Sequence, residues 1–412
     1  MNEAILVLNA GSSSLKFAVY ELVDPERAGA SAGPMRRVLR GRVEGLKTGP
    51  RWVCLRGDLP LEAWPLDSVP AVDWDHARAL EMILKRIAGI LPDVRLRAAG
   101  HRVVHGGPRF HAPVVVDSEV LESLRKLIPL APRHQPHGLA AVTSLQATRP
   151  DLIQVACFDT AFHATQNILA QRFPLPRVWH EEHGVRGYGF HGLSYESVVG
   201  HFSESGGEGG DGRMVVAHLG SGSSLAAIVE GRCVATTMGL TPLDGLMMGT
   251  RSGRLDPGVI LYLMREHGYD EARISRMLYD ESGLLGVSGL SSDMRTLLAS
   301  DSPWAREAVD LFVYRAAQEI ASMIVPLGGI DALVFTGGVG ENSAWVRASI
   351  CDRLQWLGID LVAEKNESSA SRISSMGSAV KVCVVPTDEE AVIAEHTRGL
   401  LQGSKPSLAR PA

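Results

Sequence analysis

The chain has 412 residues, 45% of them apolar and 21% charged, which is an ordinary balance for a globular protein long enough to form two domains. The net charge of −5 and the 6% of aromatic residues argue against nucleic acid as a partner. The five cysteines have no C-x-x-C spacing, so we expect reduced thiols rather than a disulfide framework. No apolar run approaches the length of a membrane span, and MNEAILVLNAG lacks the basic region of a secretion signal; we expect a cytoplasmic protein.

The first half of the chain alternates short apolar strands with helices. Strands are predicted near residues 5–9 and 15–22, followed by a polar, Pro/Gly-broken stretch over residues 24–70. Apolar residues then recur at helical spacing over 75–91, 118–131 and 137–148, with strands at 98–107 and 152–159 between or after them. This order predicts an α/β layered architecture.

The second half repeats the opening of the first. After a Gly-rich loop at 203–213, the segment MVVAHLGSGSSLAAIVEG forms a second strand, Gly/Ser turn and strand, with Leu225 and Val229 placed 210 positions after Leu15 and Val19. Helices are predicted around 258–280 and 304–325, strands at 331–338 and 380–387, and a disordered tail at 403–412. We therefore expect two related α/β domains with a cleft between them.

Three Gly/Ser-rich turns are candidates for phosphate binding: NAGSSSLK at 9–16, HLGSGSS at 218–224 and FTGGVGENS at 335–343. Turns without bulky side chains let backbone N–H groups approach an anion. Each turn alone is also compatible with a purely structural role: HLGSGSSL lacks the third glycine of G-x-G-x-x-G, and GTRSGR has Arg254 where a Walker A motif needs Lys. The duplication resembles the actin, sugar-kinase and Hsp70 superfamily (ribonuclease H-like domains), in which hairpins from both domains hold the phosphates of ATP.

Several charged residues suit phosphoryl transfer. Arg102 and Arg251 lie beside glycines, and an arginine fork binds oxyanions bidentately, although most arginines form only surface ion pairs. Asp159 and Glu389 follow buried strands, where a carboxylate can orient a ligand or hold a metal, but acids at 388–390 also suit a helix N-terminus. His191 lies between glycines in GYGFHGLS and is a further candidate.

Taken in order, eight motifs resemble the acetate kinase (acetokinase) family over residues 5 to about 398. They are LNAGSSSLKF, GHRVVHGG, FDTAFH, YGFHG, GLTPLDGLMMGTRSGRLDPG, GLSSDMR, FTGGVGENS and PTDEE. The resemblance implies two duplicated actin-like ATPase domains with a nucleotide cleft, residues 1–160 completed by a helix at 390–402, and residues 161–389. It also implies Mg²⁺, with Mn²⁺ as a possible substitute, ATP as co-substrate, and a homodimer, since the family is typically dimeric.

The resemblance implies roles residue by residue. Asp159, His191 and Arg251 match catalytic residues, and Arg102 matches the arginine that holds the substrate carboxylate, beside an apolar wall of Val104, Phe190 and Pro242. Asn9 and Glu389 match the metal-binding positions. The nucleotide-binding positions match Lys16, His218, Leu219, Gly220, Ser221, Gly222, Asp293, Met294, Arg295, Gly338, Val339, Gly340, Glu341 and Asn342.

Three positions depart from the commonest family pattern. Arg133 stands where the family usually has an apolar residue lining the acyl pocket; it either turns outward, which we favour because long side chains reach solvent easily, or the pocket accepts a more polar acid. Ser221 replaces a common Asn beside the phosphates and leaves pyrophosphate as an alternative donor, and Met294 replaces a frequent Phe. Alternative activities are a propionate or butyrate kinase, an Hsp70-like ATPase and, from the His-rich segments, a zinc hydrolase.

Overall fold

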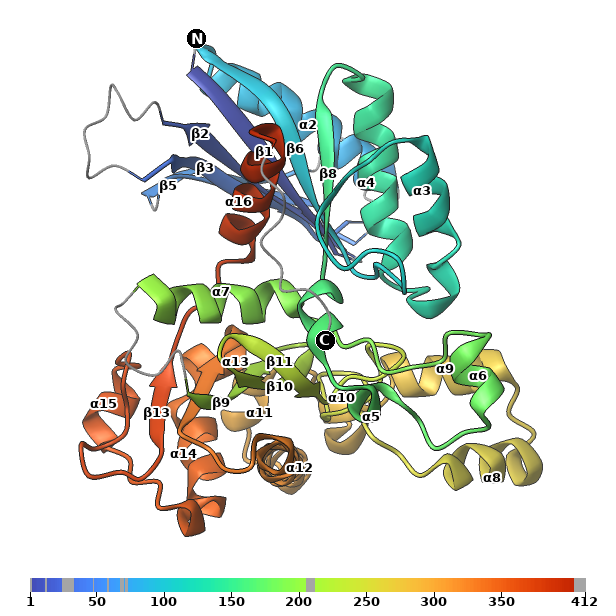
Figure 1. The fold of residues 1–412 in the computed structure, drawn as a ribbon, viewed down its shortest axis with the longest axis vertical. Coiled ribbons are helices and arrows are strands. Elements are labelled where there is room, and N and C mark those ends of the chain that lie inside the picture. Colours follow the sequence, from blue (N-terminus) through green and yellow to red (C-terminus); the bar gives the residue numbers. More distant parts are fainter. Residues whose placement is uncertain are drawn as a thin grey trace. The chain divides into compact units, whose positions relative to one another are not determined.

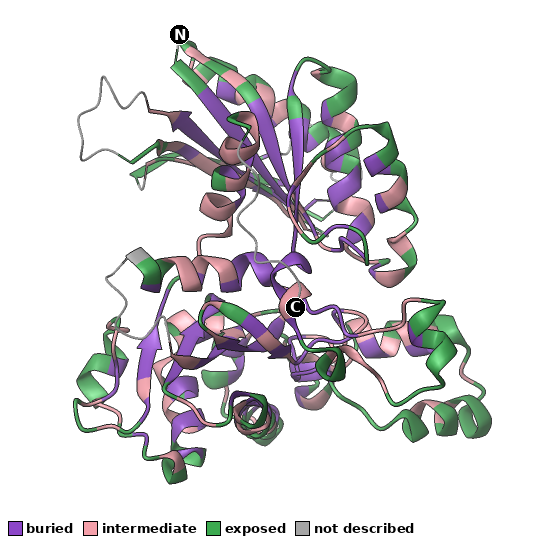
Figure 2. Ribbon diagram, in the orientation of Figure 1, coloured by how far each residue is buried: buried purple, intermediate pink, exposed green. Residues whose placement is uncertain are grey.

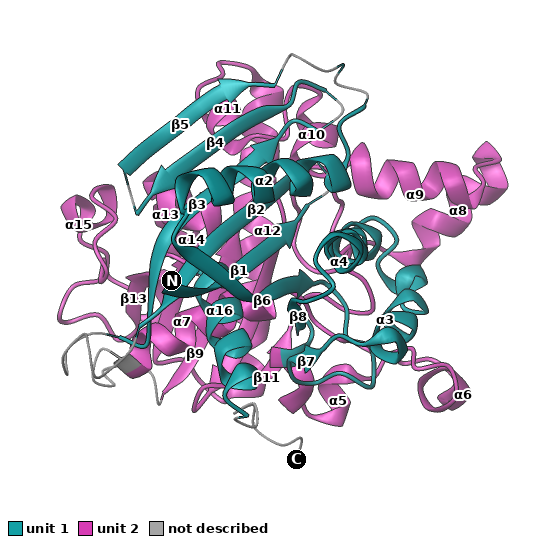
Figure 3. Cartoon of the chain, turned by 90° about the horizontal axis from the view of Figure 1, so that it is seen from above, with its two compact units in different colours: residues 1–161, 388–408 teal, residues 162–387, 409–412 magenta. Residues whose placement is uncertain are grey.

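The chain, seen in a computed structural model, folds into two compact units, which Figure 3 distinguishes by colour. The first comprises Met1–Ala161 and Asp388–Leu408, and the second comprises Phe162–Thr387 and Ala409–Ala412. The structure describes residues 2–11, 13–23, 33–46, 48–57, 59–66, 70, 73–204 and 212–403. Most of the predicted loop at 203–213 and, except for Gly403, the predicted disordered tail at 403–412 lie outside these residues.

The first unit is built on an eight-stranded sheet in the order β5-β4-β3-β2-β1-β6-β8-β7. The strands β1, β2 and β3 pair antiparallel, whereas β1, β6 and β8 run parallel to one another. The bounds are Asn2–Ala10 (β1), Ser14–Leu22 (β2), Met35–Glu44 (β3), Arg51–Arg56 (β4), Leu59–Pro65 (β5), Val94–Val103 (β6), Val114–Val115 (β7) and Ile153–Phe158 (β8). The strands β3 to β5 lie in the stretch for which the sequence predicted only broken structure, because they extend the sheet through pairing rather than through a strong apolar pattern.

Helices cover both faces of this sheet, and the strand interiors are buried (Figure 2). On one face, Leu6 and Leu8 pack with Leu80 and Ile83 of α2 (His76–Ile90). On the other face lies α16 (Glu389–Leu401), the last helix of the chain, which packs against β1 and β6. A Cβ at Gly100 of β6 would come within 2.3 Å of Thr397 Oγ1, so glycine lets α16 approach the strand closely. The predicted helix at 118–131 ends at Arg125 (α3, Ser118–Arg125) and is followed by a 3₁₀ turn, Ile128–Leu130 (η2), and α4, Gln135–Thr148.

The second unit is built on a five-stranded sheet in the order β11-β10-β9-β12-β13. Its strands are Arg213–Leu219 (β9), Ser223–Val229 (β10), Arg232–Thr236 (β11), Ala332–Thr336 (β12) and Lys381–Val384 (β13). The sheet alternates its side chains between two cores: Val215 and Ala217 face the long helix α12 (Pro303–Leu327), whereas Met214 and Val216 face α7 (Gly192–Glu204). In Figure 1 this unit is marked by the labels α5 to α15, β9 to β11 and β13.

Smaller helices complete the second unit. They are Ala161–Thr165 (η3, which begins at the last residue of the first unit), Ile168–Gln171 (α5), Arg177–Glu181 (α6), Pro257–His267 (α8), Glu271–Asp280 (α9), Gly283–Ser288 (α10), Met294–Leu298 (α11), Gly337–Asn342 (α13), Ala344–Arg353 (α14), Gln355–Leu357 (η4) and Ala363–Glu367 (α15). Among the described residues, no helix combines the length and the apolar character needed to cross a bilayer.

The two sheets share one strand order. In the first unit the central strands read β3-β2-β1-β6-β8, and in the second they read β11-β10-β9-β12-β13, with the same parallel and antiparallel pairings. The two Gly/Ser hairpins, β1–β2 and β9–β10, occupy the same positions in these sheets. The α/β fold class with two duplicated actin-like domains, expected from the sequence, is confirmed.

Candidate active site

In the first unit, the predicted substrate arginine and the predicted catalytic aspartate form a buried ion pair. Arg102 lies at the carboxyl end of β6, and Asp159 follows directly after the parallel neighbour β8, so both side chains leave the same edge of the sheet. Arg102 donates from Nε to Asp159 Oδ1 at 2.9 Å and from Nη2 to Oδ2 at 2.6 Å, the bidentate arrangement expected of a guanidinium and a carboxylate. Asp159 is 1% exposed.

The two predicted metal-binding residues belong to the same cluster. Asn9, at the end of β1, accepts a hydrogen bond from Arg102 Nη1 at 3.3 Å and donates one to Glu389 Oε2 at 3.3 Å. Glu389 is the first residue of α16, whose N-cap is Asp388, so the helix start brings this carboxylate to the strand ends. Burial alone would lower the pKa of Arg102, but the charges of Asp159 and Glu389 outweigh burial and raise it above its ordinary value.

The first unit also contains the predicted phosphate contact Lys16 and two residues expected near the acyl pocket, Val104 and Arg133. Lys16 pairs with Asn9 across the β1–β2 hairpin, so the two side chains leave the same face; Asn9 is buried and Lys16 is exposed. Val104 follows Arg102 by two residues and is half-buried. Arg133, in the segment before α4, is half-buried as well.

In the second unit, His191 and Arg251 approach the same point. His191 precedes α7 and has a positive φ of 58°, which is uncommon for a residue with a side chain and is often retained at functional sites. A Cβ added to Gly222, in the β9–β10 turn, would lie 2.7 Å from Arg251 Nη2 and 3.2 Å from His191 Nε2. Glycine at this position therefore keeps open the space into which both predicted catalytic side chains point.

Two predicted pocket residues support these side chains. Phe190 is 1% exposed, and its carbonyl oxygen accepts a hydrogen bond from His163 Nε2 at 2.8 Å, which holds the chain just before His191. The carbonyl oxygen of Pro242 accepts a hydrogen bond from Arg251 Nη1 at 2.5 Å. Both residues thus help to fix the positions of the predicted catalytic residues His191 and Arg251.

A cavity of about 790 Å³ in the second unit gathers many of the predicted nucleotide-binding residues. Its volume lies within the range of small-molecule sites. Three segments meet there: the β9–β10 turn, the start of α11 and helix α13 after β12. The predicted residues that line it are Gly220, Ser221, Asp293, Met294, Arg295, Gly338, Val339 and Asn342.

Other predicted nucleotide-binding residues lie outside the lining of this cavity. Leu219 is buried in the core, and Gly340 is buried within α13. Glu341 Oε1 accepts hydrogen bonds from the backbone N–H groups of Gly337 and Thr387, so this carboxylate holds two loops together. His218 stacks on His191, with ring centroids 4.3 Å apart.

The structure also adds residues that the sequence reasoning did not select. Leu298, Ala299 and Ser343 line the cavity; Ser343 was already part of the FTGGVGENS motif, but the other two had no distinctive signal. Ser224 and Tyr195 connect to His191 by hydrogen bonds. Tyr195 follows His191 by four residues, but His191 lies outside α7 with a positive φ and Ser224 lies on another segment, so the sequence carried no signal for this connection.

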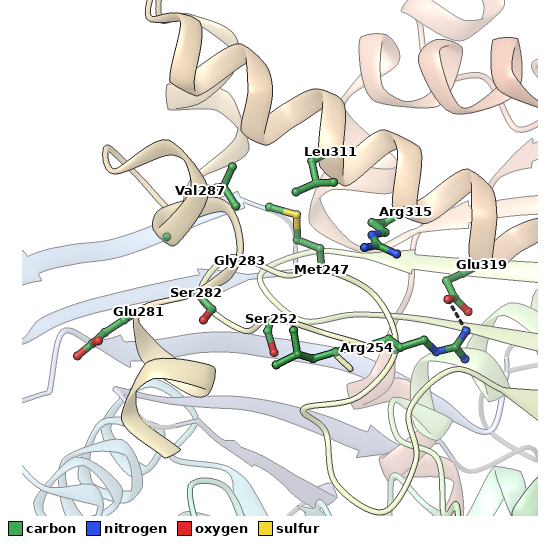
Figure 4. A pocket seen from close by; sticks show the side chains of 13 residues that line it. Met247, Ser252, Arg254, Glu281, Ser282, Gly283, Val287, Leu311, Arg315 and Glu319 are labelled. Atoms are coloured by element: carbon green, nitrogen blue, oxygen red, sulfur yellow. Dashed lines mark ion pairs between the residues drawn. The ribbon is translucent and has the colours of Figure 1, made fainter. Parts of the chain in front are cut away.

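A second cavity, of about 350 Å³, lies beside the loop that carries Arg251 (Figure 4). Ser252 and Arg254 line it, but its charged groups already have partners: Arg254 pairs with Glu319 at 2.8 Å, and Glu281 pairs with Arg273 at 2.6 Å. Burial raises the pKa of Glu319, against the opposing charge of Arg254. None of the residues predicted to act in phosphoryl transfer lines this cavity, so we do not assign it to the reaction.

The first-unit cluster suits a hard divalent cation better than a zinc site. Its donors are the oxygens of Asn9, Asp159 and Glu389, the ligand type that Mg²⁺ prefers. Within the described ranges, no cluster of three or more His, Cys, Asp or Glu side chains is arranged to hold a metal by itself. Mg²⁺ in nucleotide enzymes commonly takes only one or two carboxylates and completes its shell with water and phosphate oxygens, and the residues present fit that pattern.

Two actin-like domains, an arginine–carboxylate cluster and a Gly-lined cavity define a kinase of the ATPase-domain class. A family model described as the acetokinase family matches residues 4–395. An acetate kinase of Rhodopseudomonas palustris (strain TIE-1) is 47% identical over 408 residues, covering 98% of this chain and 100% of that protein. The chain belongs to the acetokinase family.

Solved structures of the family agree with this assignment. The crystal structure of Porphyromonas gingivalis acetate kinase has a TM-score of 0.83 and 37% identity, covering 97% of this chain and 100% of that one. The structure of a propionate kinase from Francisella tularensis subsp. tularensis SCHU S4 has a TM-score of 0.85 and 35% identity, covering 96% and 99%.

Proposed function

We propose that the protein is an acetate kinase, which transfers the γ-phosphoryl group of ATP reversibly to acetate and forms acetyl phosphate and ADP. The observation that carries the proposal is the 47% identity to an acetate kinase over nearly the whole of both chains. The Arg102 cluster and the second-unit cavity support it, because they supply a carboxylate-binding cation and a nucleotide-sized pocket.

The acceptor needs no general base. A carboxylate is already ionised at pH 7, so its oxygen can attack the γ-phosphorus directly and in line. We propose that Arg102 binds the carboxylate of acetate, and that Val104, Phe190 and Pro242 form the apolar wall for its methyl group. Arg102 already carries two hydrogen bonds to Asp159, so its fork is held in one orientation before the substrate arrives.

The main barrier is electrostatic, because two anions must approach each other. We propose that Arg251 and His191 stabilise the charge on the transferring phosphoryl group and that Asp159 takes part in the transfer without becoming a nucleophile. The approach of Arg251 Nη2 and His191 Nε2 to one point near Gly222 supports this assignment. Direct transfer predicts inversion of configuration at phosphorus.

We propose that the nucleotide occupies the cavity formed by the β9–β10 turn, α11 and α13, with Lys16 near its phosphates. The remaining predicted contacts are His218, Leu219, Gly222, Gly340 and Glu341, of which Glu341 holds two loops together. Asn9 and Glu389 would hold Mg²⁺, or Mn²⁺ in its place, beside Asp159; the ion would neutralise charge on the phosphates.

A related acid is the second candidate substrate. The propionate kinase structure is similar over the whole chain, although its 35% identity is below the 47% of the acetate kinase. Arg133 is the residue expected to change the acid specificity. If its side chain faced the acyl pocket, a more polar acid would be favoured. We expect acetate as the preferred substrate and ATP, rather than pyrophosphate, as the donor despite Ser221.

We also propose a cytoplasmic homodimer. The second unit carries an apolar helix, α8, in which Leu261, Tyr262 and Met264 are 59%, 51% and 47% exposed. None of the residues of α8, all of which are described, is buried. An apolar helix face of this kind is typical of a protein interface. Light scattering should give twice the chain mass, and Leu261→Glu should shift the protein toward the monomer.

The decisive experiment measures acyl phosphate directly. The enzyme is incubated with Mg-ATP and acetate, propionate, butyrate or glycolate, ADP release is followed, and acyl phosphate is trapped with hydroxylamine. We expect kcat/KM to be highest for acetate. A preference for a longer or hydroxylated acid would assign a different carboxylate kinase, and ADP release without hydroxamate from any acid would contradict the proposal.

A further inference from the structure

A chain of buried hydrogen bonds ends on the imidazole of His191. The Tyr195 hydroxyl lies 2.5 Å from Ser224 Oγ, and Ser224 Oγ lies 2.8 Å from His191 Nδ1. Tyr195 and Ser224 are both 0% exposed. The opposite ring nitrogen, Nε2, points toward the space beside Gly222 that Arg251 also faces.

Counting protons along this chain leaves one arrangement in which every hydroxyl is satisfied. Neither the Tyr195 hydroxyl nor the Ser224 hydroxyl has another hydrogen-bond partner among the described residues. If Tyr195 donates to Ser224 and Ser224 donates to Nδ1, both protons have acceptors. If Nδ1 carried the proton and donated to Ser224, a buried hydroxyl proton of either Ser224 or Tyr195 would have no acceptor, which is unfavourable.

The hydrogen bond at Nδ1 requires a neutral ring, and a second imidazole stacks on it. His218 lies over His191 with centroids 4.3 Å apart and rings inclined by 17°, and its Nδ1 contacts Ser194 Oγ at 2.8 Å. A charged ring would carry protons on both nitrogens, so it could not accept a hydrogen bond from Ser224 at Nδ1. A neutral ring that accepts at Nδ1 must carry its proton on Nε2.

We propose that Tyr195 and Ser224 are positioning residues that hold His191 as the neutral Nε2–H tautomer. In this form His191 presents a hydrogen-bond donor to the transferring phosphoryl group without needing to be charged. The role of this hydrogen-bond chain in catalysis rests on the proposed function. The tautomer of His191 does not, because it can be observed in the protein without substrates. The positive φ of His191 fits this role, because an unusual backbone conformation aims the ring between Ser224 and the site.

The test is the tautomer of His191 in ¹⁵N-histidine-labelled protein, read from two-bond ¹⁵N–¹H correlation spectra without substrates. The His191 signals are assigned by their loss in His191→Gln. We expect a protonated Nε2 in the wild type and in Tyr188→Phe, a matched control whose lost hydroxyl donates instead to the Gly184 carbonyl at 2.9 Å. Tyr195→Phe and Ser224→Ala should give a mixture of tautomers.

Kinetics separates positioning from folding. In Tyr195→Phe we expect kcat for acetyl phosphate formation to fall about tenfold while the KM values for acetate and ATP stay within about twofold. A wild-type ring protonated on Nδ1, or a tautomer unchanged in both Tyr195→Phe and Ser224→Ala, would overturn the inference. If the expected tautomer is found but no acyl phosphate forms with any acid, the positioning of His191 by Tyr195 and Ser224 is supported and the proposed function is wrong.

Discussion

The two units have the same central sheet but place different chemistry at the ends of its strands. In the first unit, the strand ends carry long polar side chains that bind one another: Arg102, Asp159, Asn9 and, from α16, Glu389. In the second unit, the equivalent hairpin ends in Gly220, Ser221 and Gly222 and borders a cavity. One topology has produced a charged cluster in one copy and an open, Gly-lined pocket in the other.

The difference shows how a duplicated fold can divide one reaction. A parallel strand pair brings its carboxyl ends to one edge in both copies, so the scaffold supplies a place for a ligand twice. Side-chain identity then decides which ligand is bound: a fixed guanidinium favours a carboxylate, and small residues leave room for a nucleotide. We propose that Arg102 of the first unit binds the carboxylate of the acid and that the second unit provides the cavity for ATP, and the predictions below test that assignment.

The largest effect is expected for Arg102→Ala in the first unit. Acyl phosphate formation should fall by about 1000-fold or more, because both the substrate cation and the partner of buried Asp159 are lost. Unfolding free energy should fall by about 3–5 kcal/mol, since the mutation leaves a buried carboxylate without its partner. Urea titration and the hydroxamate assay measure the two losses.

The matched control is Arg97→Ala on the same strand, β6. Arg97 forms an exposed ion pair with Glu3, and such pairs contribute about 0–1 kcal/mol. Activity should be unchanged. An equal loss of activity in both variants would show that any disturbance of β6 inactivates the enzyme.

Arg251→Ala tests the corresponding cation of the second unit. We expect kcat to fall about 100- to 1000-fold with a smaller change in the KM for ATP, because the side chain is proposed to act on the transferring group. Arg254→Ala, three residues later in the same loop, removes a guanidinium that pairs with Glu319 instead. If Arg254→Ala reduced kcat as strongly as Arg251→Ala, the loop as a whole rather than Arg251 would be responsible.

Two glycines of the second unit are expected to respond differently to alanine. A Cβ at Gly222 would lie 2.7 Å from Arg251 Nη2, so Gly222→Ala should displace that side chain and lower kcat about tenfold or more. At Gly338, which lines the cavity, a Cβ would meet no atom of the described chain within 4 Å. Gly338→Ala should therefore fold normally and weaken nucleotide binding by only about a few fold. Steady-state assays measure kcat and stopped-flow experiments measure nucleotide binding for both variants. A larger loss of kcat in Gly338→Ala than in Gly222→Ala would contradict the geometry.

The smallest effect is a dependence of stability on pH that both units share. Burial lowers the pKa of His101 in the first unit and of His163 in the second to about 4. Because the unfolded chain binds a proton at each site below its ordinary pKa of about 6.5 and the folded chain does not, stability falls as pH drops from about 6.5 toward 4.

As the pH falls through that window, each of these two histidines should lower the free energy of unfolding by about 1.4 kcal/mol per pH unit. Urea unfolding at several pH values measures the slope. His163→Gln should reduce the slope, and a slope that is unchanged in this variant would show that the histidine is protonated in the folded protein.

Much of the fold was predictable from the sequence, because the strand and helix periods of the core are strong. The Gly/Ser hairpins, the strand that precedes Asp159 and the duplication at an interval of 210 residues all gave signals in the sequence. The strands β3 to β5 were not predicted: Leu39, Val43, Trp52 and Cys54 are buried, but most of the other residues are half-buried or exposed and β5 has no buried residue, so the apolar signal is weak. Their conformation comes from pairing, β3 with β2, β4 with β3 and β5 with β4, which is a tertiary effect.

The candidate site was predictable as motifs but not as geometry. Motif positions selected Arg102 and Asp159, whereas only the structure places them in one bidentate pair. The same motif marked Gly338 and Glu341 alike, yet Gly338 lines the cavity and Glu341 binds backbone N–H groups. The Tyr195–Ser224–His191 chain joins two segments about thirty residues apart, so no local pattern reveals it.

The division of labour between the units is tested most directly by calorimetric binding of ADP to Arg102→Lys, which keeps a cation beside Asp159 but loses the bidentate fork. We predict that this variant binds ADP with a Kd within about twofold of the wild type while the KM for acetate rises about tenfold or more. A loss of ADP affinity as large as the loss for acetate would contradict the assignment of the acid to the first unit and the nucleotide to the second.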